Sequence, residues 1–188
     1  RKMQMNIWHD IDQSKIKADD FYAVIEISKG SKNKYELDKD TGLIMLDRIL
    51  YTSTHYPANY GFIPLTYAND LDPLDVLVLC SEALVPVSLV RCYPIGVIRM
   101  IDGKYDDDKI IAIPYNDPNM NHYKTLDDVP KHMISEIEHF FMVYKNLEHK
   151  STTGFKLEGK KQAIDIINQA LQDYQKSKDK LIRKNIRL

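Results

Sequence analysis

The sequence predicts an α+β fold in which a small β-barrel is followed by helices. Short alternating or unbroken apolar runs, typical of strands, occupy the first two-thirds of the 188 residues, and helical periodicity occupies the last third. Several short, mostly antiparallel strands within about 100 residues favour a closed or nearly closed barrel, because closure removes exposed edges. No repeat or flexible linker divides the chain, so we expect a single domain over residues 1–188.

The N-terminal part of the chain contains three predicted strands. Residues 21–27 alternate between apolar and mixed faces, and the polar stretch 28–33 reads as a hairpin loop. Residues 34–38 form the second predicted strand. A turn at 40–42 separates it from the third, at 43–50.

Three later segments complete the predicted strands. Residues 76–80 form a short unbroken apolar run, as expected of a buried strand, and residues 109–113 form another. Residues 89–101 are interrupted at Pro94, which leaves open whether they form one bent strand or two.

The C-terminal third predicts two helices. Asp128 is the expected N-cap of the first, with Pro130 in its first turn. The second starts near Lys160, carries an apolar stripe and continues as a basic helical tail after about residue 176. We interpret this tail as a solvated helix end, with an interaction arm as the alternative.

Composition narrows the classes of function. The net charge is −1, from 26 basic and 27 acidic residues, which argues against a general nucleic-acid or membrane-surface binder. No apolar run approaches the roughly 18 residues of a membrane span. Cys80 and Cys92 lie in apolar runs outside any CxxC pair, as expected of buried thiols in a cytoplasmic protein. Because the sequence begins with Arg1, a trimmed targeting segment stays an open alternative.

The stretch 70–75 is the most informative motif. It places Asp70, Asp72 and Asp75 just before a buried strand, and carboxylates packed this densely repel one another unless cations neutralise them. It is not an EF-hand loop, because Asp75 stands at the sixth position and Ser81 at the twelfth. The alternative is a solvated acidic turn.

A second acidic turn strengthens the case for metal. It contains four aspartates between two predicted strands, and two such turns could converge at one mouth of a barrel. Metal ions held there would clamp phosphoryl oxygens and activate water. The four residues are Asp102, Asp106, Asp107 and Asp108.

Basic residues in or beside apolar strands suggest phosphate binding. Lys34, Arg48 and Lys109 are of this kind, although for each a structural ion pair is an alternative. Alternation places Asp47 on the opposite face from Arg48, so we do not expect those two to pair. Glu26 would be explained by a cross-hairpin pair with Lys34. Together these groups fit a metal–polyphosphate complex.

Several motifs in a fixed order resemble the soluble inorganic pyrophosphatases of the β-barrel type. The resemblance covers roughly residues 22–159. It implies a five-stranded, OB-like barrel flanked by helices, and Mg²⁺-dependent hydrolysis of pyrophosphate to two phosphates, with Mn²⁺ as a possible substitute. The motifs are 36–39 (ELDK), 46–48 (LDR), 56–64 (YPANYGFIP), 70–78 (DLDPLDVLV), 91–96 (RCYPIG), 107–109 (DDK), 139–141 (HFF) and 144–145 (YK).

The resemblance also implies roles for individual residues. Asp70, Asp75 and Asp107 match ligands of the two metals that hold the attacking water, Asp102 matches a ligand of the metal arriving with substrate, and Asp72 matches the general base. The positions matching pyrophosphate contacts are Lys34, Arg48, Tyr60, Lys109, Tyr144 and Lys145. Glu26 and Glu36 match acids that reach further ions through water, and Tyr56 matches a residue lining the pocket.

Some positions depart from the family pattern. Leu71 stands where a glycine is usual, Gly103 where bacterial relatives often carry Glu, and Lys160 where many carry Trp. The segment 148–155 is irregular, so we assign no role to Lys150. The compact size resembles the homohexameric members more than the dimeric ones.

Two other classes of protein are alternatives. One is a non-catalytic OB-type module that stacks single-stranded nucleic acid on some of the 12 tyrosines. Acidic turns at the barrel mouth disfavour it, because without metal they repel phosphates. The other, a calcium-binding structural module, fails the loop-spacing test.

Overall fold

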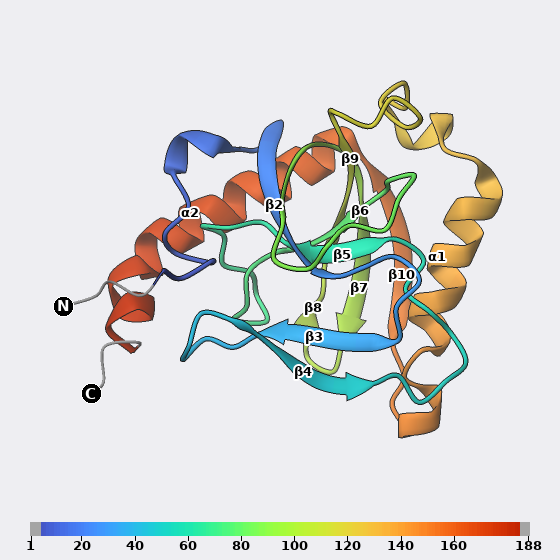
Figure 1. The fold of residues 1–188 in the computed structure, drawn as a ribbon, viewed down its shortest axis with the longest axis horizontal. Helices are drawn as coiled ribbons and strands as arrows, with labels where there is room; N and C mark the ends of the chain where they lie inside the picture. The colour runs from blue at the N-terminus through green and yellow to red at the C-terminus, as the bar shows by residue number, and fades with distance from the viewer. Residues whose placement is uncertain (1–4, 185–188) are drawn as a thin grey trace.

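The structure is a computed structural model, which describes residues 5–184 (Figure 1). The strands are β1 (Ile16–Lys17), β2 (Asp20–Ile27), β3 (Asn33–Leu37), β4 (Ile44–Ile49), β5 (Asn59–Phe62), β6 (Asp75–Val78), β7 (Leu89–Asp102), β8 (Tyr105–Asp106), β9 (Lys109–Pro114) and β10 (Thr153–Gly159). The helices are α1 (Lys131–Val143) and α2 (Lys160–Lys184), with the 3-10 turns η1 (Gln13–Lys15), η2 (Leu126–Asp128) and η3 (Asn146–Glu148).

Five strands close into a ring. The order is β2–β5–β6–β9–β7, and β7 pairs again with β2. Only β6 and β9 run parallel in this ring; the other four pairs are antiparallel. The predicted five-stranded, OB-like barrel in an α+β fold is confirmed. Closure leaves few unpaired backbone groups at strand edges.

The segment around Pro94 forms one long bent strand rather than two, since β7 runs without a break over residues 89–102. Its first residues pair with β2, its middle with β9 and its end with β10. The register shifts between Pro94 and Gly96, where proline supplies no N–H to the ladder.

Strands β3 and β4 form a separate two-stranded sheet outside the ring. Figure 1 shows this hairpin lying in front of the barrel strands. The prediction of strands at 34–38 and 43–50 is confirmed to within one residue at each end. Since the hairpin carries Lys34 and Arg48, it delivers predicted site residues from outside the barrel.

Two hydrophobic clusters fix the helices against the barrel. Phe140 and Phe141 of α1 belong to one cluster with Ile113 of β9, and Tyr174 of α2 belongs to the other with Phe21 of β2. Both cysteines are free and buried, as expected. Within residues 5–184, no helix combines the length and apolar character needed to cross a membrane.

Some elements differ from the sequence prediction. Strands β5 and β10 were missed, because Asn59–Phe62 lacks apolar alternation and β10 begins inside the segment taken as irregular. Helix α1 begins at Lys131, and Asp128 caps the preceding turn instead: its Oδ2 accepts the backbone N–H groups of Lys124 and Thr125 at 2.8 and 2.9 Å. Helix α2 continues through the predicted basic tail to Lys184, and Arg187 lies outside the described residues.

Gly61 allows β2 and β5 to approach. A Cβ built at Gly61 would lie 1.8 Å from the carbonyl oxygen of Val24, a distance at which backbone must move. We expect Gly61→Ala to lower the free energy of unfolding by about 3 kcal/mol in urea titration. The control is Gly30→Ala, where φ is +83° but the space is open, with an expected loss of about 1 kcal/mol. Equal losses in both variants would contradict this account of the β2–β5 contact.

Candidate active site

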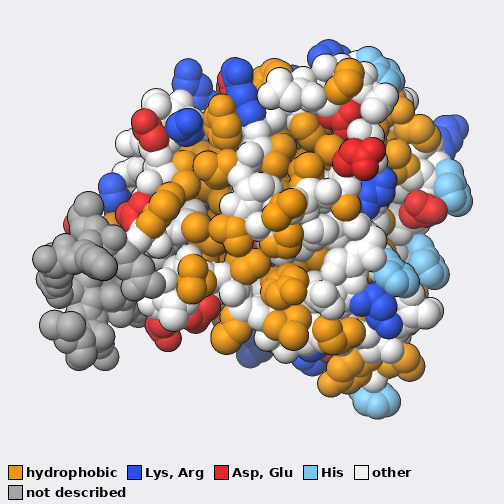
Figure 2. Space-filling model, in the orientation of Figure 1, with side chains coloured by type: hydrophobic (Ala, Val, Ile, Leu, Met, Phe, Trp, Pro, Cys, Tyr) orange, Lys and Arg blue, Asp and Glu red, His pale blue; other side chains and the backbone are white. Residues whose placement is uncertain are grey.

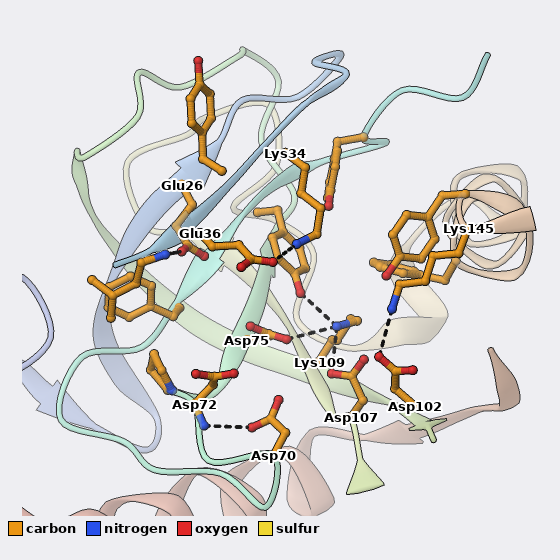
Figure 3. A pocket seen from close by; sticks show the side chains of 18 of the residues that line it. Glu26, Lys34, Glu36, Asp70, Asp72, Asp75, Asp102, Asp107, Lys109 and Lys145 are labelled. Carbon is orange, nitrogen blue, oxygen red and sulfur yellow. Dashed lines mark hydrogen bonds and ion pairs between the residues drawn. The ribbon is translucent and has the colours of Figure 1, made fainter. Parts of the chain in front are cut away.

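A cavity of about 270 Å³ opens at one end of the barrel (Figure 3). Carboxylates, lysines and tyrosines dominate its lining. The acids are Glu26, Glu36, Asp70, Asp72, Asp75, Asp102 and Asp107, and the lysines are Lys34, Lys109 and Lys145. Seven acids against three lysines leave a large excess of negative charge.

The two acidic turns converge because β6 and β9 run parallel and adjacent. Their first residues, Asp75 and Lys109, are register partners, so the turns preceding both strands meet at the same edge of the sheet. Oxygen atoms of Asp70, Asp75 and Asp107 all lie within 4.8 Å of one another. Asp102 lines the cavity but falls outside this group of three.

Lys109 is the internal counter-ion of the group. Its side chain is buried, and Nζ donates to Asp75 and Asp107 at 3.0 Å each and to the Tyr60 hydroxyl at 2.8 Å. Burial acts to lower the pKa of Lys109, but the facing Asp75, Tyr60 and Asp107 outweigh it, so the pKa lies well above its usual range. One ammonium cannot balance three ionised carboxylates, so the group carries an excess of negative charge when all three are ionised.

The excess of negative charge is reflected in the raised pKa values of two of these acids. Burial, with the neighbouring Asp75, raises the pKa of Asp70 to about 7. Burial also raises the pKa of Asp75, although Lys109 opposes it. Hard oxygen donors crowded together in this way are the ligand set that divalent cations such as Mg²⁺ prefer. The group therefore fits a divalent metal ion.

Glu26 enters the cavity through a β-bulge. Ile25 pairs with Gly61 and Ile27 with Tyr60, so Glu26 is the extra residue between them. Its Oε2 accepts the backbone N–H of Leu37 at 2.7 Å. The alternative explanation of Glu26 by a cross-hairpin pair with Lys34 does not hold, because Lys34 pairs with Glu36 and Asp47 instead. Burial, with the charge of Asp75, raises the pKa of Glu26 to about 8.

Asp72 lies half-exposed on the loop before β6. Its backbone N–H donates to Asp70 at 3.1 Å, and its carboxylate contacts Lys39, a residue that sequence reasoning left without a role. Leu71 between the two aspartates has φ +68°, the left-handed conformation that explains why glycine is usual there. The leucine side chain is 54% exposed, so little packing offsets this backbone strain.

The opposite wall of the cavity comes from the end of α1. Lys145 Nζ donates to Asp102 at 2.9 Å, and Tyr144 stacks on Phe140. Tyr56 and Tyr60 lie nearby, and burial raises the pKa of both phenols well above their usual range. Tyr56 and Tyr60 are therefore neutral at neutral pH.

The second acidic turn divides between two places. Asp102 and Asp107 line the cavity, whereas Asp108 pairs with Arg99 at 2.7 Å and Asp106 approaches Asn69 at 3.5 Å. The latter two line a smaller separate cavity beside α2. Residues 105–108 alternate between the two cavities, since Tyr105 and Asp107 line the first and Asp106 and Asp108 line the second.

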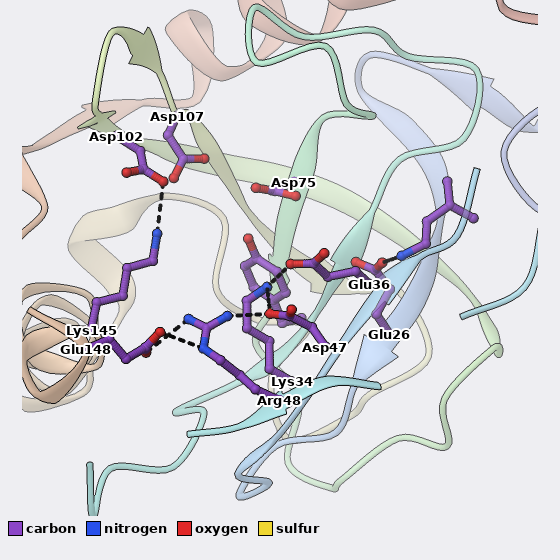
Figure 4. A network of polar contacts seen from close by, with 12 residues as sticks. Glu26, Lys34, Glu36, Asp47, Arg48, Asp75, Asp102, Asp107, Lys145 and Glu148 are labelled. Atoms are coloured by element: carbon purple, nitrogen blue, oxygen red, sulfur yellow. Dashed lines mark hydrogen bonds and ion pairs between the residues drawn. The ribbon is translucent and has the colours of Figure 1, made fainter. Parts of the chain in front are cut away.

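Arg48 is not among the residues lining the cavity. It pairs with Asp47 and with Glu148 of η3 (Figure 4). The expectation that Asp47 points away is wrong, because Lys34 faces Arg48 and Tyr35 faces Leu46, which makes Asp47 the extra residue of a bulge. Glu148 was also missed, since it lies 100 residues away in a segment without a regular pattern.

A closed OB-like barrel with clustered carboxylates and facing lysines fits the class of proteins that bind divalent metal together with an anion. The family model for inorganic pyrophosphatase matches residues 23–175, and the chain belongs to the inorganic pyrophosphatase family. Membership of this enzyme family decides against both non-catalytic readings of the sequence.

Individual relatives of the chain support this family assignment. The chain is 42% identical over 174 residues to the inorganic pyrophosphatase of Haloferax volcanii, covering 92% of this chain and 98% of that protein. The inorganic pyrophosphatase structure from Helicobacter pylori superposes with a TM-score of 0.83 at 44% identity, covering 88% of this chain and 99% of the other. The one from Thermus thermophilus gives a TM-score of 0.81 at 37% identity, covering 87% and 94%.

The buried Glu26 predicts a pH dependence of stability. Folded Glu26 keeps its proton up to a pKa of about 8, whereas the unfolded chain releases it near 4.5. Unfolding between these values releases a proton, so the free energy of unfolding falls as pH rises from 5 to 8. We expect Glu26→Gln, in chelator, to remove on the order of 3 kcal/mol of that fall in urea titrations.

The control for this measurement is Glu138→Gln, an exposed carboxylate on α1. It should keep the wild-type dependence of stability on pH. If Glu26→Gln also kept the wild-type dependence, the buried carboxyl would not be the cause.

Proposed function

We propose that this chain hydrolyses inorganic pyrophosphate to two phosphates with Mg²⁺ as its metal. The charge of the cavity carries the proposal. Seven carboxylates and three lysines line it, so a free polyanion would be repelled, whereas a complex of pyrophosphate with divalent cations would meet both signs of charge. The family supports pyrophosphate as that anion.

We assign the metal ligands to the convergent acids. Asp70, Asp75 and Asp107 would hold two metal ions, and Asp102 would hold a further ion that enters with substrate. Bound metal supplies charge neutralisation of the phosphates and a lower pKa for water. Mg²⁺ suits an all-oxygen ligand set, and Mn²⁺ is expected to substitute.

The remaining residues bind substrate and move the proton. Asp72, half-exposed at the cavity, accepts the proton of the attacking water. The groups that bind the phosphate oxygens are Lys34, Arg48, Tyr60, Lys109, Tyr144 and Lys145. Glu26 and Glu36 reach further ions through water, and Tyr56 packs against Tyr60 and shapes the wall.

The state of the protein in the cell belongs to the same proposal. We place the chain in the cytoplasm as a single domain, and the two free buried cysteines support a reducing compartment. A homohexamer is favoured over a dimer. Hydrophobic side chains spread over the face shown in Figure 2, which supports burial against other copies. Tyr51, Val85 and Leu147 are also each more than 60% exposed. Sedimentation at the mass of one or two chains would contradict the hexamer.

The first experiment measures phosphate release from pyrophosphate by the purified chain. Fast release is expected with Mg²⁺, none with chelator, and little from ATP, the control substrate. A folded, metal-supplied protein that released no phosphate would overturn the proposal.

Removal of one charge from the metal group should abolish turnover without unfolding the protein. We expect Asp75→Asn to lower kcat by at least about a hundredfold and to weaken Mg²⁺ binding in calorimetry, because a neutral amide replaces a ligand oxygen. Asp72→Asn should lower kcat by a similar factor with Mg²⁺ binding kept, as a lost general base predicts.

The matched control for both variants is Asp106→Asn, from the same acidic turn but outside the cavity lining. It should keep wild-type turnover. Near-wild-type turnover in Asp75→Asn would instead refute the metal assignment.

A further inference from the structure

Arg48 is held by a carboxylate that belongs to no predicted site residue. Its Nε lies 2.8 Å from Oε1 of Glu148, and Nη2 donates to Oε2 at 3.1 Å (Figure 4). The Glu148 side chain is only 7% exposed and that of Arg48 19%. The Nη2 contact has hydrogen-bond geometry, whereas Nε makes an ion-pair contact only, so one charge-assisted hydrogen bond and one close ion-pair contact hold Arg48 to Glu148.

The Arg48–Glu148 pair offsets charge repulsion between two cations of the β3–β4 hairpin. Lys34 and Arg48 are direct cross-strand partners, and like charges in that arrangement repel. The hairpin itself supplies two counter-ions, since Asp47 contacts both cations and Glu36 contacts Lys34. Glu148 adds the third carboxylate from a different part of the fold.

Glu148 also stands in a position that links the hairpin to the cavity wall. Its backbone N–H donates to the carbonyl of Lys145 at 3.0 Å, so one short turn presents Lys145 to Asp102 and Glu148 to Arg48. The β3–β4 hairpin forms a sheet of its own, without ladder pairing to the barrel. Side-chain contacts such as this one therefore determine where its cations lie.

We propose that Glu148 is a positioning residue: through Arg48 it fastens the β3–β4 hairpin to the turn after α1 and so sets Arg48 and Lys34 opposite Lys145. The kinetic effect of this inference rests on the proposed function, because it is measured as a change in KM for pyrophosphate. Glu148 does not line the cavity, so its effect on substrate passes through Arg48. The opposite reading makes Glu148 a competitor that occupies a phosphate-binding cation, and the two readings predict opposite changes in KM.

The kinetic test is a double-mutant cycle. We expect Glu148→Ala and Glu148→Gln to raise KM for pyrophosphate about tenfold with kcat within about twofold of wild type. In an Arg48→Ala background, Glu148→Ala should change KM by less than about twofold, because its target is gone. Glu138→Ala, an exposed carboxylate of α1, is the matched control and should leave KM unchanged.

A second readout does not depend on activity. In Glu148→Ala without metal or substrate, backbone amides of residues 33–49 should exchange with deuterium faster than in wild type, and amides of β6 should not change. If wild type released no phosphate, the proposed function would fail while this measurement still tested the fastening contact.

Three outcomes would overturn the inference. A lower KM in Glu148→Ala would make Glu148 a competitor of substrate. An equal rise in KM with and without Arg48 would separate Glu148 from Arg48. Unchanged exchange in the hairpin would show that the contact does not hold it.

Discussion

Repulsion among carboxylates at the starts of β6 and β9 is the constraint on which the rest of this structure depends. Parallel pairing puts Asp75 beside Lys109 and brings the two preceding acidic turns to one edge, so the acids cannot avoid one another. Lys109 offsets part of the charge, and burial leaves the pKa of Asp70 near 7. A site held under such repulsion is unfavourable for folding by itself, and that is consistent with a cavity built for cations.

Two β-bulges place further charged side chains at or beside the cavity, in positions that regular strand alternation would not give them. The extra residue in β2 is Glu26, which ends buried beside the acids, and the extra residue in β4 is Asp47, which reaches both Lys34 and Arg48. In a regular strand, a residue at either position would follow the alternation of its neighbours. Both bulges lie next to the cavity, where the local change in direction aims a side chain rather than weakening the sheet.

This explains which parts the sequence could predict. The barrel and most residues of the cavity could be predicted from the sequence. Aspartates clustered before apolar runs, together with ordered motifs that resemble a family, are visible in local spacing and composition. Alternation failed at Asp47, since a bulge leaves no mark in the pattern. Glu148 was beyond local reasoning, because its contact with Arg48 spans 100 residues. Strand β5 was missed because close approach to β2, which selects Gly61, removed its apolar signal.

The pairing of charges has a consequence for how substrate would enter. Each cation of the site already has a carboxylate partner: Lys109 has Asp75 and Asp107, Lys145 has Asp102, and Lys34 has Glu36. If these acids turn to divalent metal as proposed, the lysines lose their partners and become free for phosphate oxygens. Phosphate binding would in turn remove the competitors for the carboxylates. Metal and pyrophosphate would then favour each other's binding by the same factor, as reciprocal linkage between two sites requires.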